Sequence, residues 1–551
     1  MCGIFGGNPE LLCDDPEGLL LHRGPDQQGR TMVSSGAQAP FMLGQTRLNV
    51  VYKGNVPTPM TRNGATVVFN GEIYNWRELR SDLETIGYDF ETQTDTEVAL
   101  YAYLEWGERC LDRFNGMFAL AIWSGGELFI ARDRIGKKPV FYTHAGGQFA
   151  FASELKCFRK LDFMEVQICE NLEFYFDEYT PFQSIRSLKP GEFLKYSPES
   201  NRLTLQTWWH LPDGAADIHE EDEAVDGFLA LFEDACRLRL AADVPVTVFL
   251  SGGTDSSLIQ AVLGCDITYT VQFEEFRETI DESSLVKEFA ADLGFDARIV
   301  VPSREDFLAT LPEVARHIEY PVGSFSVYPL FCLARQMRQD GFVVAISGEG
   351  ADELFNGYFR NELLLAEDDR IADDLRGPYG PLCSKYFGSG LARFCRMATR
   401  RGLGGVPALV DFLGHIWDDD ASLSRNLRRV EASVFLQPLL TMADRMSMAN
   451  SIEVRNPYLD YRLIEFSARL ADNLRWRDGQ GKWVVRRALR RLVGDDLGIV
   501  RRKIKHGLPT PANQWLFNKH TFDRREWNHI LLGECLRQLG LSHSDVTTAG
   551  V

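Results

Sequence analysis

Two adjacent glycines between hydroxyl side chains follow a β-branched apolar segment, in the run Thr247-Val248-Phe249-Leu250-Ser251-Gly252-Gly253-Thr254-Asp255-Ser256-Ser257. Glycines allow backbone N–H groups to approach an anion closely, and the serine hydroxyls add further donors. The residues from Ser256 onward are expected to open a helix, whose N-terminal dipole also favours negative charge. The run therefore predicts a phosphate-binding loop, with an ordinary Ser/Gly turn as the alternative.

Asp255 places a carboxylate inside this loop. A carboxylate beside phosphates is best explained by Mg²⁺, which binds one or two carboxylates together with phosphate oxygens. The run lacks the Gly-Lys-Ser/Thr of a Walker loop and the glycine spacing of a dinucleotide turn. The pattern Ser-Gly-Gly-x-Asp-Ser instead resembles the PP-loop of ATP pyrophosphatases, which split ATP between its α and β phosphates. The resemblance implies ATP as a substrate that adenylates a second molecule.

Cys2 is the second residue that could do chemistry, because it directly follows the initiator Met. Removal of that Met would give Cys2 a free α-amine, so that one residue would carry a thiol nucleophile and a base. An α-amine titrates at roughly 7.7 to 8.0 and could accept the thiol proton near neutral pH. The alternative is a small buried hydrophobic residue.

Further motifs accompany Cys2 in order along the chain. They are Met-Cys-Gly-Ile at the start, His22-Arg23-Gly24-Pro25-Asp26, Arg47, Phe69-Asn70-Gly71-Glu72-Ile73-Tyr74-Asn75, Thr94-Asp95-Thr96-Glu97 and Ala131-Arg132-Asp133-Arg134. Together they resemble the class II glutamine amidotransferase domain, in which the N-terminal Cys attacks the side-chain amide of glutamine and releases ammonia.

The resemblance assigns a role to each matching residue. Cys2 would be the nucleophile, Asn70 and the Gly71 N–H the oxyanion hole, Arg47 the ligand of the glutamine α-carboxylate, and Glu72 and Asp95 the ligands of its α-amino group. Chemistry agrees, since an oxyanion needs fixed neutral donors and an amino acid needs opposite charges at its two ends. Taken alone, Asn70-Gly71 also fits a type I′ hairpin turn. For His22 and Arg23 we favour a structural loop.

One departure is the short segment of about twenty residues between Cys2 and His22. We expect a helix there to be missing or shortened, which affects the outer wall of a glutamine pocket but not the nucleophile.

The N-terminal elements read as a β-rich α+β layered arrangement, the N-terminal-nucleophile fold of antiparallel sheets with helices. Strands are predicted at 65–69, 118–123, 127–131 and 149–152, and helices at 76–86 and 96–106. From Ala224 the pattern changes to alternating helices and strands. Strands at 244–250, 267–273, 297–301 and 342–346 alternate with helices at 224–240, 281–293, 306–318 and 328–338, and the C-terminal third is mostly helical.

This alternation predicts an α/β doubly wound parallel sheet, which binds ligands outside the carboxyl ends of its strands. The glycine loop lies at one such end, and Ser347-Gly348-Glu349-Gly350-Ala351-Asp352-Glu353 lies at another. These two runs, with Asp444-Arg445-Met446-Ser447-Met448-Ala449, Glu453-Val454-Arg455-Asn456-Pro457-Tyr458-Leu459-Asp460 and Gly481-Lys482-Trp483, resemble the synthetase domain of glutamine-hydrolysing asparagine synthetases. The resemblance covers nearly the whole chain.

The resemblance implies that Asp255 and Asp352 hold Mg²⁺ on the pyrophosphate of ATP, that Lys482 contacts the phosphates, and that Glu349 takes a proton from ammonia. The ATP-binding residues it implies are Leu250, Ser251, Gly252, Gly253, Asp255, Ser256, Ser257, Val271, Ser347 and Gly348. Charge that spreads over phosphate oxygens needs a metal and a lysine, and an attacking amine must lose a proton. Asp352 and Glu353 could alternatively cap a helix.

The reaction implied is hydrolysis of glutamine to ammonia, followed by ATP-dependent conversion of a carboxylate, by expectation aspartate, to its amide with release of AMP and pyrophosphate. Residues 317–329 hold no Arg, where some asparagine-forming relatives carry a Thr-Thr-Ile-Arg run that contacts aspartate. Thr254, Asn356 and His506-Gly507-Leu508 are smaller departures. A sugar uronic acid, a peptide carboxylate or a natural-product acid therefore stays open as the acceptor.

Length and composition limit the number of domains, the classes of ligand and the cellular location that we expect. A chain of 551 residues needs at least two domains, and we expect boundaries at 1–210, a linker at 211–223 and 224–551. The net charge of −19 argues against general affinity for nucleic acids or acidic membranes. Eleven cysteines without a Cys-x-x-Cys pair fit a reducing compartment, and no leader or bilayer-spanning run is evident, so we expect the cytoplasm. The assembly, with a homodimer as one candidate, stays open.

Two other classes of function fit parts of the sequence. A PP-loop enzyme that modifies nucleobases predicts a basic surface, and the basic residues at 475–491 and 501–505 are its only support. We favour a solvated helix face there, with a few residues directed at pyrophosphate. A non-catalytic scaffold would have no need for Cys2, Asp255, Asp352 and Lys482 together.

Overall fold

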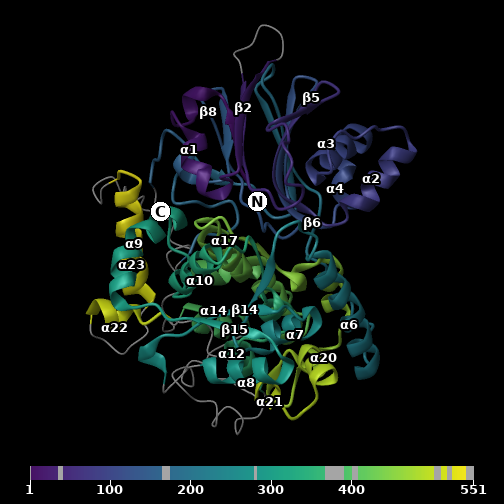
Figure 1. The fold of residues 1–551 in the computed structure, drawn as a ribbon, viewed down its shortest axis with the longest axis vertical. Helices are drawn as coiled ribbons and strands as arrows, with labels where there is room; N and C mark the ends of the chain where they lie inside the picture. The colour runs from purple at the N-terminus through teal and green to yellow at the C-terminus, as the bar shows by residue number, and fades with distance from the viewer. Residues whose placement is uncertain are drawn as a thin grey trace.

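The computed structural model describes residues 2–34, 41–163, 174–277, 282–366, 390–399, 407–501, 510–517 and 524–541. Figure 1 shows two parts, an upper one built from the chain up to β12 (Arg202–Thr207) and a lower one built from the rest of the chain. The basic run at 502–505, residues 506–508 and the last ten residues lie outside the described ranges. Within those ranges, no helix combines the length and the apolar character needed to cross a bilayer.

The N-terminal part consists of two six-stranded sheets in which all named strand pairs are antiparallel. The first has the order β10 (Arg186–Ser187), β8 (Phe141–Ala145), β9 (Gln148–Ala152), β1 (Cys2–Gly7), β3 (Phe41–Arg47), β2 (Gln27–Val33), and the second β12 (Arg202–Thr207), β11 (Glu192–Ser197), β7 (Glu127–Arg132), β6 (Gly116–Ser124), β5 (Ala65–Ile73), β4 (Met60–Arg62).

Side chains alternate between two cores along β5, as a period of two requires. Val68 packs with Ile4 and Leu43 between the sheets, while Val67 and Phe69 pack under the helices α2 (Trp76–Thr85) and α3 (Asp95–Trp106). The helices cover the outer face of the second sheet (Figure 1). The predicted α+β layered arrangement is confirmed.

The C-terminal part is organised around a parallel sheet with the order β15 (Asp296–Val300), β14 (Ile267–Val271), β13 (Val246–Phe249), β16 (Val344–Ile346), β17 (Glu453–Arg455). The chain moves outward from β13 to β15 and then returns to β16 on the other side of β13. The order therefore reverses between β13 and β16, which is where such sheets bind ligands. The doubly wound sheet is confirmed, with β17 as an additional edge strand.

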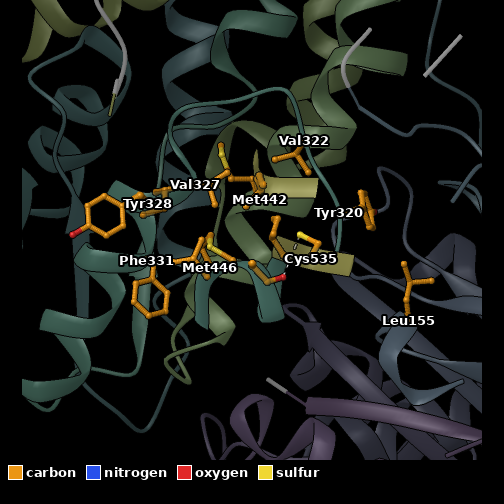
Figure 2. Packing of buried hydrophobic residues seen from close by; sticks show 14 of the residues in the cluster. Leu155, Tyr320, Val322, Val327, Tyr328, Phe331, Met442, Met446 and Cys535 are labelled. Atoms are coloured by element: carbon orange, nitrogen blue, oxygen red, sulfur yellow. Dashed lines mark hydrogen bonds between the residues drawn. The ribbon is translucent and has the colours of Figure 1, made fainter. Parts of the chain in front are cut away.

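Helices cover both faces of this sheet. Val248 and Leu250 face a core that includes α6 (Glu221–Leu238), α7 (Thr254–Leu263), α8 (Ser283–Leu293) and α20 (Trp483–Val493). Phe249 faces the opposite core, with α9 (Arg304–Ile318), α10 (Val327–Gln339) and α17 (Leu436–Met448). Figure 2 shows Tyr328 and Phe331 of α10 near Met442 and Met446 of α17, and Leu155 of the N-terminal part closing the same core.

The remaining described helices belong mostly to the C-terminal third, as predicted. They are α1 (Pro16–Leu20), α4 (Cys110–Arg113), α11 (Ala351–Leu354), α12 (Phe359–Leu365), α14 (Gly390–Thr399), α15 (Pro407–Gly414), α16 (Leu423–Val430), α18 (Tyr461–Arg469), α19 (Asp472–Arg475), α21 (Gly498–Arg501), α22 (Ala512–Phe517) and α23 (Arg524–Gln538). The short α1 lies between Cys2 and His22, and a shortening of this segment relative to the family stays a prediction.

The linker expected at 211–223 overlaps the start of α6. Residues 221–223 form the first turn of α6 rather than a linker, because acidic side chains stabilise a helix N-terminus. These acids also pair with the basic block, since Arg487 lies 2.6 Å from Glu221 and Arg491 lies 3.2 Å from Asp222. These ion pairs agree with the solvated helix face that we favoured for the basic residues at 475–491.

A buried ion network joins the two parts. Asp444 of α17 accepts from Arg23 (2.8 Å) and Lys138 (3.2 Å), and Arg23 also donates to Glu154 (2.9 Å). Burial alone would raise the pKa of Asp444, but Arg23 and Lys138 lower it to about 2. Arg23 therefore links the two parts through a buried ion pair, and a structural role for it stays our prediction.

Candidate active sites

Cys2 begins β1, where its partner across the ladder is Arg47 of β3. The Cys2 backbone N–H donates to Asn70 Oδ1 at 3.2 Å, and Arg23 Nε donates to the Cys2 carbonyl at 3.1 Å. Cys2 is buried but not fully enclosed, with 7% of its surface exposed. Adjacent strands and the packing of β5 against β1 thus bring Cys2, Arg47 and Asn70 together.

Asn70 and Gly71 lie inside β5, so the hairpin-turn alternative is wrong. The tertiary pairing of β5 with β6 overrides the local turn preference. A Cβ on Gly71 would lie 2.1 Å from the Met117 carbonyl oxygen, so only glycine fits there. Asn70 is fully buried, and within the described ranges its Nδ2 has no hydrogen-bond partner. A fixed, unsatisfied N–H donor beside Cys2 matches the chemistry of an oxyanion hole.

Two buried carboxylates, Glu72 and Asp95, lie at the same end of β5. Asp95 begins α3 and accepts from the Ile73 N–H at 3.0 Å. Burial raises the pKa of Asp95 to about 6, and burial together with Asp95 and Glu453 raises the pKa of Glu72 well above its usual value. Neighbouring carboxylates that resist ionisation are stabilised by a cationic ligand such as an α-ammonium group.

Arg47 closes the other side of this site. Its guanidinium donates to the carbonyl oxygens of Val51 (3.1 Å) and Tyr52 (2.8 Å) and to Gln27 Oε1 (2.6 Å). The guanidinium is therefore held in place by the loop after β3. A guanidinium close to two carboxylates suits the α-carboxylate and α-ammonium groups of an amino acid.

The glycine loop follows β13, as predicted. Gly252 adopts a φ of 68°, which favours glycine, and α7 begins at Thr254 with Asp255, Ser256 and Ser257 buried in its first turn. The Ser256 hydroxyl accepts from the Ser251 N–H (3.0 Å), which holds the loop closed. Leu250 directly follows β13 and Val271 ends β14, at the sheet edge where the family resemblance implies the nucleotide.

The second loop, after β16, meets the first. A Cβ on Gly348 would lie 3.1 Å from the Cβ of Asp255, so the loops are in contact at the reversal of strand order. Lys482 Nζ lies 2.9 Å from Asp255 Oδ2 and 2.8 Å from Asp352 Oδ1. Since two carboxylates reach one cation position, they also fit Mg²⁺ bound with phosphate oxygens.

The helix-capping alternative holds for one of the two acids only. Glu353 accepts from the Gly350 N–H at 3.1 Å and so caps α11, whereas Asp352 contacts Lys482. Lys482 is itself buried and fixed, because its N–H donates to the Phe355 carbonyl oxygen (2.8 Å). Within the described ranges, no group of three or more His, Cys, Asp or Glu side chains could hold a metal.

Arg455 and Asn456 belong to the motif Glu453–Asp460, to which the sequence analysis assigned no role in either site. Arg455 NH2 lies 3.6 Å from Glu72 Oε1, and its Nε lies 2.5 Å from Glu453 Oε1. The next residue, Asn456, donates through Nδ2 to Glu349 Oε2 at 2.5 Å. The end of β17 therefore contacts the Cys2 site on one side and the Glu349 loop on the other.

Comparison with known proteins agrees with this geometry. Residues 227–549 match the family described as asparagine synthase, and residues 1–209 match the glutamine amidotransferase domain. This chain belongs to the asparagine synthase family. It is an enzyme of the type that joins a glutamine amidotransferase domain to a PP-loop synthetase domain, as the sequence predicted.

Named relatives extend over nearly the whole chain. Asparagine synthetase [glutamine-hydrolyzing] 1 of Bacillus subtilis strain 168 is 30% identical over 97% of this chain and 90% of its own length. A putative asparagine synthetase [glutamine-hydrolyzing] of Mycobacterium tuberculosis strain H37Rv is 31% identical over 94% of this chain and 86% of its own. Amidase chry2 of Gibberella zeae is 26% identical over 93% and 87%.

Proposed function

We propose that the chain is a glutamine-dependent amide ligase that adenylates a carboxylic acid with ATP and aminates it. The observation that carries this proposal is that one chain builds two sites, Cys2 beside Asn70 in one part and Asp255 beside Asp352 in the other, with β17 touching both. The products would be an amide, glutamate, AMP and pyrophosphate.

In the first site, the Cys2 thiolate attacks the glutamine amide carbon, ammonia leaves, and water hydrolyses the thioester to glutamate. Asn70 Nδ2 and the Gly71 N–H donate to the developing oxyanion. Arg47 binds the α-carboxylate, and Glu72 and Asp95 bind the α-ammonium. The orphan donor of Asn70 and the raised pKa values of both carboxylates support these roles.

In the second site, the acceptor carboxylate attacks the α-phosphorus of ATP, and pyrophosphate leaves. The glycine loop, with Ser251, Gly252, Gly253, Ser256 and Ser257, together with Ser347 and Gly348, would bind the nucleotide, flanked by Leu250 and Val271. Mg²⁺ held by Asp255 and Asp352 would neutralise phosphate charge. Lys482 binds the phosphate oxygens, and Glu349, oriented by Asn456, takes a proton from ammonia as it displaces AMP.

Aspartate is the acceptor that we propose first, because several relatives are named asparagine synthetases. The likeness to a protein named an amidase, and the absence of Arg from residues 317–329, keep a sugar uronic acid, a peptide carboxylate or a natural-product acid as the alternative. A cytoplasmic location fits the cysteine content, and a homodimer is the assembly to test.

The variant Cys2→Ala tests the two-site proposal. It should lose AMP formation driven by glutamine and keep AMP formation driven by ammonium chloride. Equal loss with both nitrogen donors, or formation of ADP in place of AMP by the wild type, would contradict the proposal.

A further inference from the structure

The loop at 48–52, directly after β3, carries backbone oxygens that fix Arg47. Arg47 donates to the carbonyl oxygens of Val51 (3.1 Å) and Tyr52 (2.8 Å). Tyr52 adopts a φ of 61°, in the left-handed region that a residue with a bulky side chain occupies only where its surroundings hold it. The conformation of this loop, and with it the direction of the Arg47 guanidinium, therefore needs support from neighbouring segments.

Asp243 of the C-terminal part supplies such support. It lies in the connection at 239–245, between α6 and β13, and its carboxylate accepts from the Tyr52 N–H at 2.8 Å. Its own backbone N–H donates to the Val50 carbonyl oxygen at 2.9 Å, so Asp243 bonds the loop twice. The N–H of Tyr52 is therefore bonded to Asp243 and its carbonyl oxygen to Arg47.

The same connection is bonded to a residue beside the carboxylates of the first site. Arg455 donates to the carbonyl oxygens of Arg239 (2.8 Å) and Ala241 (2.9 Å). Its guanidinium also lies 3.6 Å from Glu72. The backbone that carries Asp243 is therefore fixed by a buried arginine, and Asp243 presents its carboxylate to the loop from a defined position.

Asp243 could instead serve only to hold the two parts of the molecule together. The buried network of Asp444, Arg23 and Lys138 already joins them, whereas Asp243 is exposed. Substitution of an exposed residue usually changes the stability of the whole fold little. Its effect on Tyr52 is larger, because a left-handed conformation relaxes once the bonds that hold it are removed. The local role at the glutamine site is therefore the stronger interpretation.

We propose that Asp243 is a positioning residue of the glutamine site. It holds Tyr52 in the conformation whose carbonyl oxygen directs Arg47 toward the α-carboxylate of glutamine. This inference rests on the proposed function, and it gives the synthetase part a share in binding the substrate of the amidotransferase part. Asp243 precedes β13, whereas the glycine loop follows that strand, so the synthetase reaction itself should not depend on the Asp243 carboxylate.

The test measures glutamate formation from glutamine by the full chain with Asp243→Ala, Asp243→Asn or Asp266→Ala. Asp266 is the matched control, an exposed aspartate directly before β14 of the same sheet. Asp243→Ala should raise the KM for glutamine about 3- to 10-fold, in keeping with the loss of a hydrogen bond, with little change in kcat. Asp243→Asn keeps an oxygen that can accept from the Tyr52 N–H, so its KM should stay within about 2-fold of the wild type. AMP formation driven by ammonium chloride should not change in any of the three variants.

A second comparison tests whether Asp243 acts through Arg47. Lysine keeps the positive charge but lacks the fork of donors that bonds both loop carbonyl oxygens, so in an Arg47→Lys background Asp243→Ala should change the KM for glutamine by less than about 2-fold. Full additivity of the two substitutions would overturn the inference, as would an unchanged KM for glutamine in Asp243→Ala.

An equal loss of glutamine-driven and ammonium-driven activity would also overturn the inference, because it would assign Asp243 a structural role only. If Asp243→Ala does not fold, Asp243→Ser, which also lacks the carboxylate, serves with the same readouts. Failure of the wild type to form glutamate from glutamine would instead refute the proposed function itself.

Discussion

Arg455 offers the sharpest test of how the two parts are connected. Its NH2 lies 3.6 Å from Glu72 Oε1, and both side chains are buried. Arg455→Met removes this positive charge from the end of β17, whereas Arg455→Lys keeps it. The first variant should therefore raise the pKa of Glu72, which burial already raises, and the second should not.

The size of the effect follows from the distance. Two unit charges 3.6 Å apart attract by about 5 kcal/mol at an effective dielectric constant of about 20, which corresponds to about three pKa units. Glu453 shares the charge of Arg455 at 2.5 Å, so this value is a ceiling. We expect the pKa of Glu72 to rise by about one to two units, equivalent to roughly a 10- to 100-fold effect.

The assay is glutamine hydrolysis as a function of pH. A protonated Glu72 cannot pair with the α-ammonium of glutamine, so kcat/KM for glutamine in Arg455→Met should fall about 10- to 100-fold along the acid limb of the pH profile and recover as the pH rises. The acid limb of the profile should move upward by about one to two pH units, while Arg455→Lys stays near the wild type. An unmoved acid limb in a variant that still folds, judged by thermal unfolding, would refute the reasoning.

Three further predictions follow from single contacts. Lys482→Met leaves Asp255 and Asp352 without their shared cation, so the Tm without metal should fall by several degrees and recover on addition of Mg²⁺; a Tm indifferent to Mg²⁺ would contradict the metal site. The pKa of Asp444 is lowered to about 2, so its carboxylate should stabilise the fold by about 2 kcal/mol above about pH 4. This contribution should be lost as the pH falls toward 2. Denaturant titration should therefore show the free energies of unfolding of Asp444→Asn and of the wild type converging between about pH 4 and 2. Gly71→Ala would place a Cβ 2.1 Å from the Met117 carbonyl oxygen, so it should lower the Tm and abolish glutaminase activity, whereas Gly214→Ala, which meets nothing within 4 Å, should do neither.

The elements that position both sites could be predicted from hydrophobic periodicity. Alternation along β5 follows from a strand between two cores, and the apolar runs at β13 and β16 follow from burial on both faces of a parallel sheet. The contact between the loops after β13 and β16 then follows from the reversal of strand order. The resemblance implied that Asp255 and Asp352 act together, and the strand order of the structure explains how they meet.

Hydrophobic periodicity could not identify residues that are buried because distant segments of the chain pack around them. Lys138 stands in a Lys-Lys pair, a pattern typical of a solvated turn, yet it is buried and donates to Asp444 of α17. Asn70-Gly71 has the local signature of a turn, yet pairing with β6 extends the strand through it. Glu453–Arg455 is short and charged, so nothing in its composition indicates a buried strand.

The structure of β17 explains why it can serve two sites at once. Its residues pair with β16 in register, Ile346 opposite Arg455, and the Ser347 N–H donates to the Arg455 carbonyl oxygen (2.9 Å). Successive side chains of a strand point to opposite faces, so Arg455 and Asn456 diverge from one rigid backbone. Arg455 reaches Glu72 on one side, and Asn456 reaches Glu349 on the other. One strand end therefore supplies neighbouring residues to both sites, Arg455 toward the carboxylate of Glu72 and Asn456 toward that of Glu349.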